Sequence, residues 1–234
     1  MVKQSMIFAA GLGTRMLPIT SHLPKPLIKI YNKSILKTNI EKLLDAGFKK
    51  IIINAFHFSN KIINEAKDYH PIVKVIIEKD RLETGGGVLN AIKQGYLEKE
   101  EPVLLLNGDI FWINEIYNSL DKIRNMWNSN QMDILLCLTK KENFFGYQGK
   151  GDFELLNPKK KVSSIFLKNE CPFAYTGLQI VKPELISTKK KKFSIKEIIY
   201  KLCEQNKAFG YLDRNPWFHI GTYEDLIKFE DNFK

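Results

Sequence analysis

The chain has 234 residues, of which 44% are hydrophobic and 26% are charged, and it carries a formal net charge of +10 at pH 7. This length and apolar content suit a single domain, 1–234, with a sizeable core, and the longest apolar runs fall far short of the roughly 20 residues that a membrane helix needs. The N-terminus lacks a signal-peptide pattern and the lysines are spread along the chain, so the composition predicts a cytoplasmic protein with neither a membrane nor a nucleic-acid partner.

A predicted strand at 6–10 ends in the loop Gly11-Leu12-Gly13-Thr14-Arg15. The amide groups of a glycine turn after a buried strand can point at an anion, and the guanidinium of Arg15 suits phosphate oxygens. Lys25 follows between two prolines that restrict its backbone. Two cations and a glycine turn indicate a nucleotide site, although the loop alone is also compatible with a plain strand-to-helix turn.

Two better-known glycine motifs do not fit this loop. A Walker loop ends in Gly-Lys-Ser/Thr, whereas Thr14-Arg15 follows Gly13 in this chain. A dinucleotide fingerprint has Gly or Ala at position 16, where this chain has Met16. The sequence therefore argues against both of these nucleotide-binding motifs.

Strand and helix patterns alternate through the first half of the chain. Strands are predicted at 50–55, 73–78 and 103–106, and helices at 35–46, 60–67 and 88–96. The first helix places Leu36, Ile40 and Leu43 on one face and stops before Gly47. This alternation predicts an α/β fold with a mainly parallel, mixed sheet and helices on both faces.

Two segments in this half have the composition of ligand-binding loops. Three glycines end the run from Leu82 to Gly87, before the predicted helix at 88–96, and such a run is costly unless something approaches the backbone closely. Asn107-Gly108-Asp109 follows the predicted strand at 103–106. Ligands of open α/β sheets bind at the carboxyl ends of the strands, so Asp109 is predicted to lie beside Gly11–Arg15.

The alternation ends after residue 110. A helix is predicted at 115–127, a strand at 133–139 and a hairpin at 152–167 around Asn157-Pro158, with no helix between its strands. The second half is therefore expected to contain a small β-rich part.

The lysine block and the cysteines of this half are predicted to be structural. Lys189–Lys192 lies between two helical segments, as a solvated connector would. Cys137, Cys171 and Cys203 are widely spaced without a CxxC pair, which indicates reduced thiols and no zinc site.

The glycine loop with Arg15 and Lys25, the run Leu82 to Gly87, Asn107-Gly108-Asp109 and the segment Trp217-Phe218-His219-Ile220-Gly221-Thr222 occur in this order along the chain. In these segments the sequence resembles the sugar-nucleotide pyrophosphorylases, and in particular their small single-domain members that act on N-acetylmuramate or mannose 1-phosphate. The resemblance implies a Rossmann-like nucleotidyltransferase fold, with a nucleotide-binding half at about 1–110 and a sugar-phosphate half at about 111–234.

The resemblance also implies the reaction. A nucleoside triphosphate and a sugar 1-phosphate would give a nucleotide sugar and pyrophosphate, with Mg²⁺ as the cofactor. Arg15, Lys25 and Asp109 would be the catalytic residues, and Asp109 would ligate the metal. The nucleotide would be bound by Ala10, Gly11, Gly13, Thr14, Arg15, Lys25, Glu83, Gly86 and Asn107.

On the sugar side the resemblance covers fewer residues. Gly146, Lys168, Thr176 and Gly177 stand where relatives bind the sugar phosphate. The neighbouring residues differ from the relatives' Glu-Lys-Pro and Asn-Ala-Gly, so the sugar stays open. A solvated lysine is an equal alternative for Lys168.

His219 is the largest departure from the family pattern. Relatives have an aspartate at this position of the Trp-x-Asp-x-Gly-Thr motif, where it supplies a second carboxylate to the metal. Imidazole suits manganese or cobalt better than magnesium, so a metal site of Asp109 and His219 would favour Mn²⁺ or Co²⁺. A hydrogen-bonded structural histidine is the alternative.

Two other functions stay open. A non-catalytic relative could bind a nucleotide sugar and regulate a partner, since His219 replaces a carboxylate. Small cytidylyltransferases that act on phosphocholine or a similar alcohol phosphate share the opening motif. The sequence discloses neither the base nor the oligomeric state.

Overall fold

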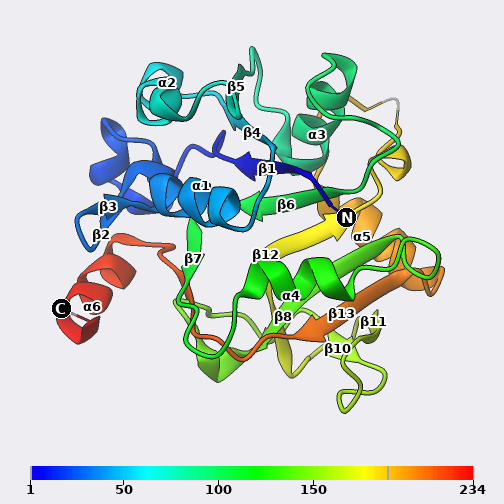
Figure 1. The fold of residues 1–234 in the computed structure, drawn as a ribbon. Coiled ribbons are helices and arrows are strands. Elements are labelled where there is room, and N and C mark those ends of the chain that lie inside the picture. The colour runs from blue at the N-terminus through cyan, green and yellow to red at the C-terminus, as the bar shows by residue number, and fades with distance from the viewer. Residues whose placement is uncertain (1, 189, 234) are drawn as a thin grey trace.

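The computed structural model describes residues 2–188 and 190–233. A nine-stranded mixed sheet, in the order β10-β11-β13-β8-β12-β6-β1-β4-β5, forms its central layer (Figure 1). The strands are β1 (Gln4–Phe8), β4 (Lys50–Ala55), β5 (Val73–Ile77), β6 (Val103–Asn107), β8 (Ile134–Lys140), β10 (Glu154–Leu155), β11 (Ser163–Phe166), β12 (Phe173–Val181) and β13 (Ala208–Leu212).

The strands β6, β1, β4 and β5 are parallel and form one half of this sheet. The apolar runs of β1, β4 and β6 are buried on both faces, as expected of parallel strands covered by helices, whereas the edge strand β5 is partly exposed. Phe8 pairs with Asn54 on one side and with Asn107 on the other, so the carboxyl ends of β1, β4 and β6 lie together at one edge. The loops after these strands open at that edge.

The long strand β12 joins the two halves of the sheet, since it pairs antiparallel with both β6 and β8. Beyond it, β13 is parallel to β8 and β11 is antiparallel to β13. The predicted α/β class with a mixed sheet is confirmed. Every antiparallel pair of this nine-stranded sheet includes a strand of the second half.

Helices cover both faces of the sheet, as predicted. The helices α1 (Ile35–Asp45), α2 (Ser59–Ala66) and α4 (Ser119–Met126) contribute to the core on one face, and α3 (Glu83–Lys93) and α5 (Ile195–Glu204) to the core on the other. The side chains of Ser34, Asn118 and Ser194 cap the N-termini of α1, α4 and α5. None of the described helices is long and apolar enough to cross a membrane.

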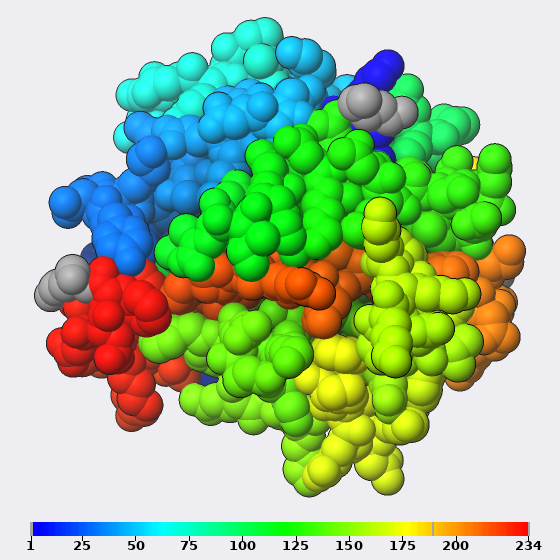
Figure 2. Space-filling model, turned by 60° about the horizontal axis from the view of Figure 1, so that its bottom comes forward, coloured from blue at the N-terminus to red at the C-terminus, as the bar shows by residue number. Residues whose placement is uncertain are grey.

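A small sheet of β7 (Ile110–Trp112), β14 (Trp217–His219) and β9 (Phe144–Phe145) lies beside the main one. Against it pack the C-terminal helix α6 (Tyr223–Phe233) and the hairpin of β2 (Lys29–Ile30) and β3 (Lys33–Ser34). Figure 2 shows α6, in red, next to the blue hairpin segment, and the rings of Tyr31 and Phe229 are 5.5 Å apart. Since His219 pairs with Ile110, this sheet holds His219 next to Asp109.

Several predicted boundaries need correction. The helix predicted at 88–96 begins at Glu83, because the three glycines form its first turns and do not precede it. The helix predicted at 115–127 begins at Ser119. The predicted hairpin at 152–167 is confirmed as the antiparallel pair β10 and β11, and the three cysteines are free and buried.

Candidate active site

A cavity of about 590 Å³ opens at the carboxyl edge of β1 and β6. Every residue predicted to bind the nucleotide lines it, except Gly86. The cavity is also lined by residues that were not assigned to the nucleotide from the sequence. They are Phe8, Leu12, Pro26, Asn54, Arg81, Thr84, Gly108, Ser194 and Gly221. The two ends of the predicted nucleotide site, the glycine loop and the start of α3, therefore face one space.

The glycine loop has two glycines with different surroundings. Gly13 has a φ of +65°, and a methyl group added to it would lie 2.9 Å from the side chain of Thr20. The hydroxyl of Thr20 donates a hydrogen bond of 2.8 Å to the carbonyl of Gly13. Around Gly11, in contrast, nothing lies within 4 Å of such a methyl group. Gly13 is needed for the turn itself, whereas Gly11 leaves space in the cavity.

Lys25 lies in the short 3-10 helix Lys25–Leu27 and is only 7% exposed. Its Nζ donates a hydrogen bond of 2.7 Å to Oδ2 of Asp109 and lies 3.4 Å from Nε2 of His219. The flanking prolines limit the backbone at this position, so the ammonium group is directed into the cavity beside Asp109.

Asp109 is placed by the close contact of β6 with β1. The amide of Gly108 donates a hydrogen bond of 2.9 Å to the carbonyl of Phe8, and a methyl group at Gly108 would lie 2.4 Å from that oxygen. Burial opposes the ionisation of Asp109. The hydrogen bond from His219 and the charge of Lys25 outweigh burial and hold the pKa of Asp109 well below its usual range.

His219 completes a cluster around one carboxylate oxygen. Its Nε2 lies 3.3 Å from Oδ2 of Asp109. An oxygen and an imidazole nitrogen at this separation suit two ligands of one divalent cation, whose other ligands would be phosphate oxygens. No group of three or more metal-ligating side chains occurs within residues 2–188 and 190–233, so the donor set fits a cation shared with a nucleotide.

The glycine run is explained by the packing of a later segment. The backbone amide of Gly86 donates to the carbonyl of Phe193, and a methyl group at Gly86 would lie 2.4 Å from the carbonyl oxygen of Lys191. A methyl group at Gly85 would collide with the ring of Phe193. The assignment of Gly86 to the nucleotide is therefore corrected, because the chain itself fills the space in front of it.

We call the segment 191–195 the strap. Its backbone is tied to the start of α3, ahead of Gly86: the amide of Phe193 donates to the carbonyl of Leu82, and the amide of Ile195 donates to the hydroxyl of Thr84. Lys191 and Lys192 are exposed and lie before α5, as predicted for the solvated connector, and their backbone begins the strap. Lys189 lies outside the described residues.

Arg81 and Glu83 are the charged residues of the cavity wall at the start of α3. Neither side chain forms an ion pair or hydrogen bond with another residue of the described part of the chain. Glu83 has a φ of +63°, a conformation that few residues other than glycine adopt. No pattern in the sequence indicated Arg81 or Ser194 as cavity residues. Asn54 could have been found, because it precedes the end of a predicted strand that is parallel to β1.

The predicted sugar-phosphate residues are less clustered. Gly177 has a φ of +87°, and a methyl group there would lie 2.7 Å from Nδ2 of Asn107, at the cavity. Gly146 packs against the carbonyl of His219. Lys168 forms an exposed ion pair of 2.6 Å with Glu154. Thr176 needs correction, because it is fully buried and its hydroxyl donates to the carbonyl of Cys137.

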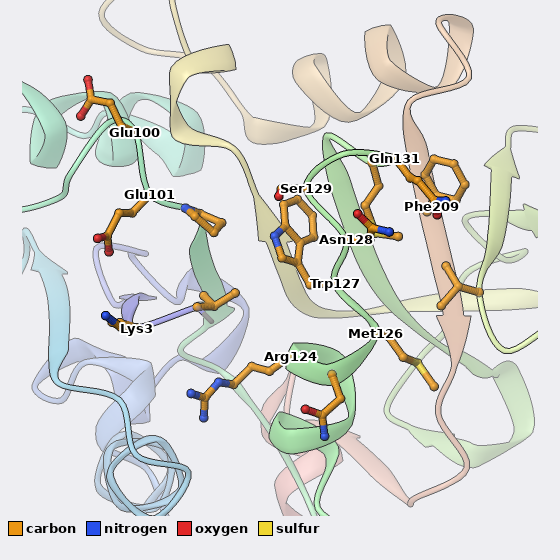
Figure 3. Close-up of a pocket in the computed structure, with 15 residues that line it drawn as sticks. Lys3, Glu100, Glu101, Arg124, Met126, Trp127, Asn128, Ser129, Gln131 and Phe209 are labelled. Carbon is orange, nitrogen blue, oxygen red and sulfur yellow. The ribbon is translucent and has the colours of Figure 1, made fainter.

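A second cavity, of about 760 Å³, lies near the opposite ends of β1 and β6 (Figure 3). Trp127 lies at its centre, and Glu101, Lys3 and Arg124 at its border. One guanidinium nitrogen of Arg124 already donates to the carbonyl of Ala46. Basic and acidic residues both line this cavity, but they form no cluster of catalytic groups. The first cavity is therefore the better candidate for the reaction site.

A glycine loop, a lysine and an aspartate at the carboxyl edge of parallel strands are typical of nucleotide-binding α/β enzymes. The model of the nucleotidyl transferase family matches residues 4–234. The chain therefore belongs to this family.

Relatives of this family agree with this placement, and a solved structure agrees with the fold. The chain is 29% identical over 228 residues to N-acetylmuramate alpha-1-phosphate uridylyltransferase of Caulobacter vibrioides, which covers 94% of this chain and 92% of the relative. It is 32% identical over 235 residues to mannose-1-phosphate guanyltransferase beta-B of Xenopus laevis, with 96% of this chain and 62% of the relative covered. The solved complex of UDP-glucose pyrophosphorylase with UDP-glucose has the same fold, with a TM-score of 0.79, 18% identity and coverage of 100% of this chain and 98% of that one.

These relatives and structural neighbours are sugar-1-phosphate nucleotidyltransferases. The resemblance to sugar-nucleotide pyrophosphorylases is confirmed, and the chain is an enzyme of the nucleotidyltransferase class. The family acts on nucleoside triphosphates and sugar 1-phosphates and generally uses a divalent metal.

Proposed function

We propose that this chain joins a nucleoside triphosphate to a sugar 1-phosphate in the cavity at the carboxyl edge of β1 and β6. The observation that carries this proposal is the convergence of Lys25 and His219 on one oxygen of Asp109, beside the glycine loop. These groups supply the charges that can neutralise a phosphate whose phosphorus is attacked, which supports the proposal.

The reaction requires alignment and charge neutralisation and no general base. An oxygen of the sugar phosphate attacks the α-phosphorus, the bond from the α-phosphorus to the bridging oxygen of the β-phosphate breaks, and pyrophosphate leaves. The attacking phosphate is already ionised near neutral pH, so no proton has to be removed from it. Preorganised cations that hold two mutually repelling anions in line are what this step needs.

We assign the charged residues accordingly. Lys25, which is buried and held by its prolines, binds the α-phosphate, and Arg15 in the glycine loop binds the β- and γ-phosphates. The amides of Gly11 and Gly13 and the wall formed by Ala10, Thr14, Glu83 and Asn107 hold the rest of the nucleotide. Asp109 and His219 would hold a divalent cation, which neutralises phosphate charge when it is bound.

The sugar phosphate is proposed to bind on the side of Asp109 that faces the 111–234 half. Gly177 lies against Asn107 there, and its lack of a side chain gives room to the Asn107 side chain, which lines the cavity. Lys168 stays a candidate ligand of the sugar phosphate, because its only ion pair among the described residues is an exposed one.

Release of pyrophosphate from a substrate panel tests this proposal. The purified chain would be incubated with UTP, GTP, CTP, ATP or dTTP, each with several sugar 1-phosphates or phosphocholine, in Mg²⁺ and in Mn²⁺. Release that depends on a sugar 1-phosphate is expected. Release only with CTP and phosphocholine would establish the cytidylyltransferase alternative, and nucleotide binding without release in any pair would establish the non-catalytic one.

A further inference from the structure

Asn54 lines the nucleotide cavity, yet both polar groups of its side chain bind other parts of the chain. Its Oδ1 accepts a hydrogen bond of 2.9 Å from the amide of Ala9, the residue that leads from β1 into the glycine loop. Its Nδ2 donates a hydrogen bond of 2.8 Å to Oε1 of Glu78. Asn54 is only 3% exposed, so these bonds are shielded from water.

Glu78 continues this chain of hydrogen bonds to the other end of the cavity. Its Oε2 accepts a hydrogen bond of 3.3 Å from the amide of Leu82, the residue before α3. Glu78 is also 3% exposed, and no ion pair of the described residues includes it. Burial raises the pKa of Glu78, although the bonds from Asn54 and Leu82 oppose this. A buried carboxylate lowers the stability of the fold unless hydrogen bonds compensate for its lost hydration. The bonds that Glu78 accepts are therefore expected to have a role.

Gly87 is packed against this pair. A methyl group at Gly87 would lie 3.0 Å from both Nδ2 of Asn54 and Oε1 of Glu78. The third glycine of the run thus gives room to the pair, whereas the first two give room to the strap. The first turns of α3 therefore pack between the strap and the Asn54–Glu78 pair.

We propose that Asn54 and Glu78 are positioning residues that set the distance between the phosphate-binding loop and the nucleoside end of the cavity. The amide of Ala9 is fixed at one end of their hydrogen-bonded chain and the amide of Leu82 at the other. A nucleotide that touches both the glycine loop and Glu83 spans this distance. The pair therefore aligns the nucleotide through the backbone at Ala9 and Leu82, because its own polar groups bind other parts of the chain.

Exchange of the two functional groups tests this inference. Asn54→Asp places two carboxylate oxygens against each other. In Glu78→Gln, the amide nitrogen must face either the Nδ2 of Asn54 or the amide of Leu82, so one donor loses its acceptor. In the double variant, the Nε2 of Gln at 78 can donate to the second oxygen of Asp at 54, and its Oε1 can accept from the amide of Leu82. All the hydrogen bonds are then restored, and only the bond between positions 54 and 78 has its direction reversed.

We expect each single variant to raise the KM for the nucleoside triphosphate about ten-fold or more, and the double variant to return within about three-fold of the wild type. The KM for the sugar 1-phosphate should change by less than about two-fold. The matched control is Gln4→Leu, which removes buried hydrogen bonds to the backbone of Glu98 and Glu101 at the opposite end of β1. It should lower stability and leave the nucleotide KM unchanged.

The inference rests on the proposed function, so one measurement is independent of turnover. Hydrogen exchange of the amides of Ala9 and Leu82 in the free protein should be faster in both single variants and restored in the double variant. Single variants that fold and keep the wild-type KM, a double variant without recovery, or a control with the same rise in KM would overturn the inference. If a single variant does not fold, the KM for the nucleoside triphosphate in the double variant tests the inference, and it should return to near the wild-type value. Absence of turnover in the wild type would instead count against the proposed function, and hydrogen exchange would still test the positioning.

Discussion

At the scale of single residues, one oxygen of Asp109 is shared by two side chains. Lys25 donates to it at 2.7 Å and His219 lies 3.3 Å from it. A half-buried carboxylate with two such partners stays ionised, and its surroundings are already arranged for an incoming polyanion. Three predictions concern these residues.

Lys25→Ala should lower turnover about a hundred-fold or more, because one preorganised charge at the transferring phosphate is lost. The variant should remain folded. Lys33→Ala is the matched control, since Lys33 forms an exposed ion pair of 2.5 Å with Glu41 outside the cavity. Steady-state release of pyrophosphate would be measured for both. A folded Lys25→Ala protein with wild-type turnover would exclude Lys25 from the mechanism.

His219→Asp should shift the metal preference towards Mg²⁺, because a second carboxylate replaces a nitrogen ligand. The ratio of turnover in Mn²⁺ to turnover in Mg²⁺ would be compared in the wild type and the variant. His57→Asp makes the same change of residue type at an exposed position outside the cavity and should leave the ratio unchanged. An equal ratio in wild type and His219→Asp would show that His219 is not a ligand.

The lowered pKa of Asp109 predicts a pH dependence of stability. A carboxyl whose folded pKa is depressed contributes stability that is fully present above its unfolded pKa, about 3.9, and is lost as pH falls through the lower folded value. The free energy of unfolding should therefore fall more steeply below about pH 4 in the wild type than in Asp109→Asn. Urea unfolding at pH 7, 4 and 3 would measure this, and parallel curves for the two proteins would contradict it.

At the scale of elements, α3 shows what a sequence pattern can miss. The glycine run was predicted to admit a nucleotide and forms instead the first turns of α3, packed against the strap and the Asn54–Glu78 pair. Glycine is a poor helix former, so propensity places the start of the helix too late. The contacts that override propensity come from the strap, about a hundred residues away in the sequence, and no local pattern encodes them.

Two glycine variants should separate packing from ligand contact. Gly86→Ala places a methyl group 2.4 Å from the carbonyl of Lys191 and should lower the free energy of unfolding by about 1–3 kcal/mol. Gly11→Ala meets no atom within 4 Å, so its stability should stay within about 1 kcal/mol of the wild type while its nucleotide affinity falls. Urea unfolding and calorimetric titration with nucleotide would measure both. A stable Gly86→Ala protein, or a Gly11→Ala protein with unchanged affinity, would contradict this division of roles.

At the scale of the whole molecule, the strand pairing of the parallel half could be predicted, and that of the second half could not, although several of its elements were. The alternation of apolar strands and amphipathic helices up to residue 110 encodes parallel neighbours, and the rule on carboxyl ends then brings the glycine loop to Asp109. The position of β12 between β6 and β8 depends on pairing between distant segments, and so does the sheet that carries His219. For that reason Lys25 and Asp109 followed from the pattern, whereas Thr176, which was predicted to bind the sugar phosphate, lies in the core.

The transfer of one labelled phosphorus tests the central claim most directly. The chain would be supplied with a nucleoside triphosphate labelled at the α-phosphorus, with the sugar 1-phosphate that supports turnover, and the products would be separated. If the sugar phosphate attacks the α-phosphorus in the cavity of Lys25 and Asp109, the label should appear in a nucleotide sugar, the pyrophosphate should be unlabelled, and Asp109→Asn should abolish both products. Label recovered in a free nucleoside monophosphate, or a labelled nucleotide sugar formed at the wild-type rate by Asp109→Asn, would contradict this account.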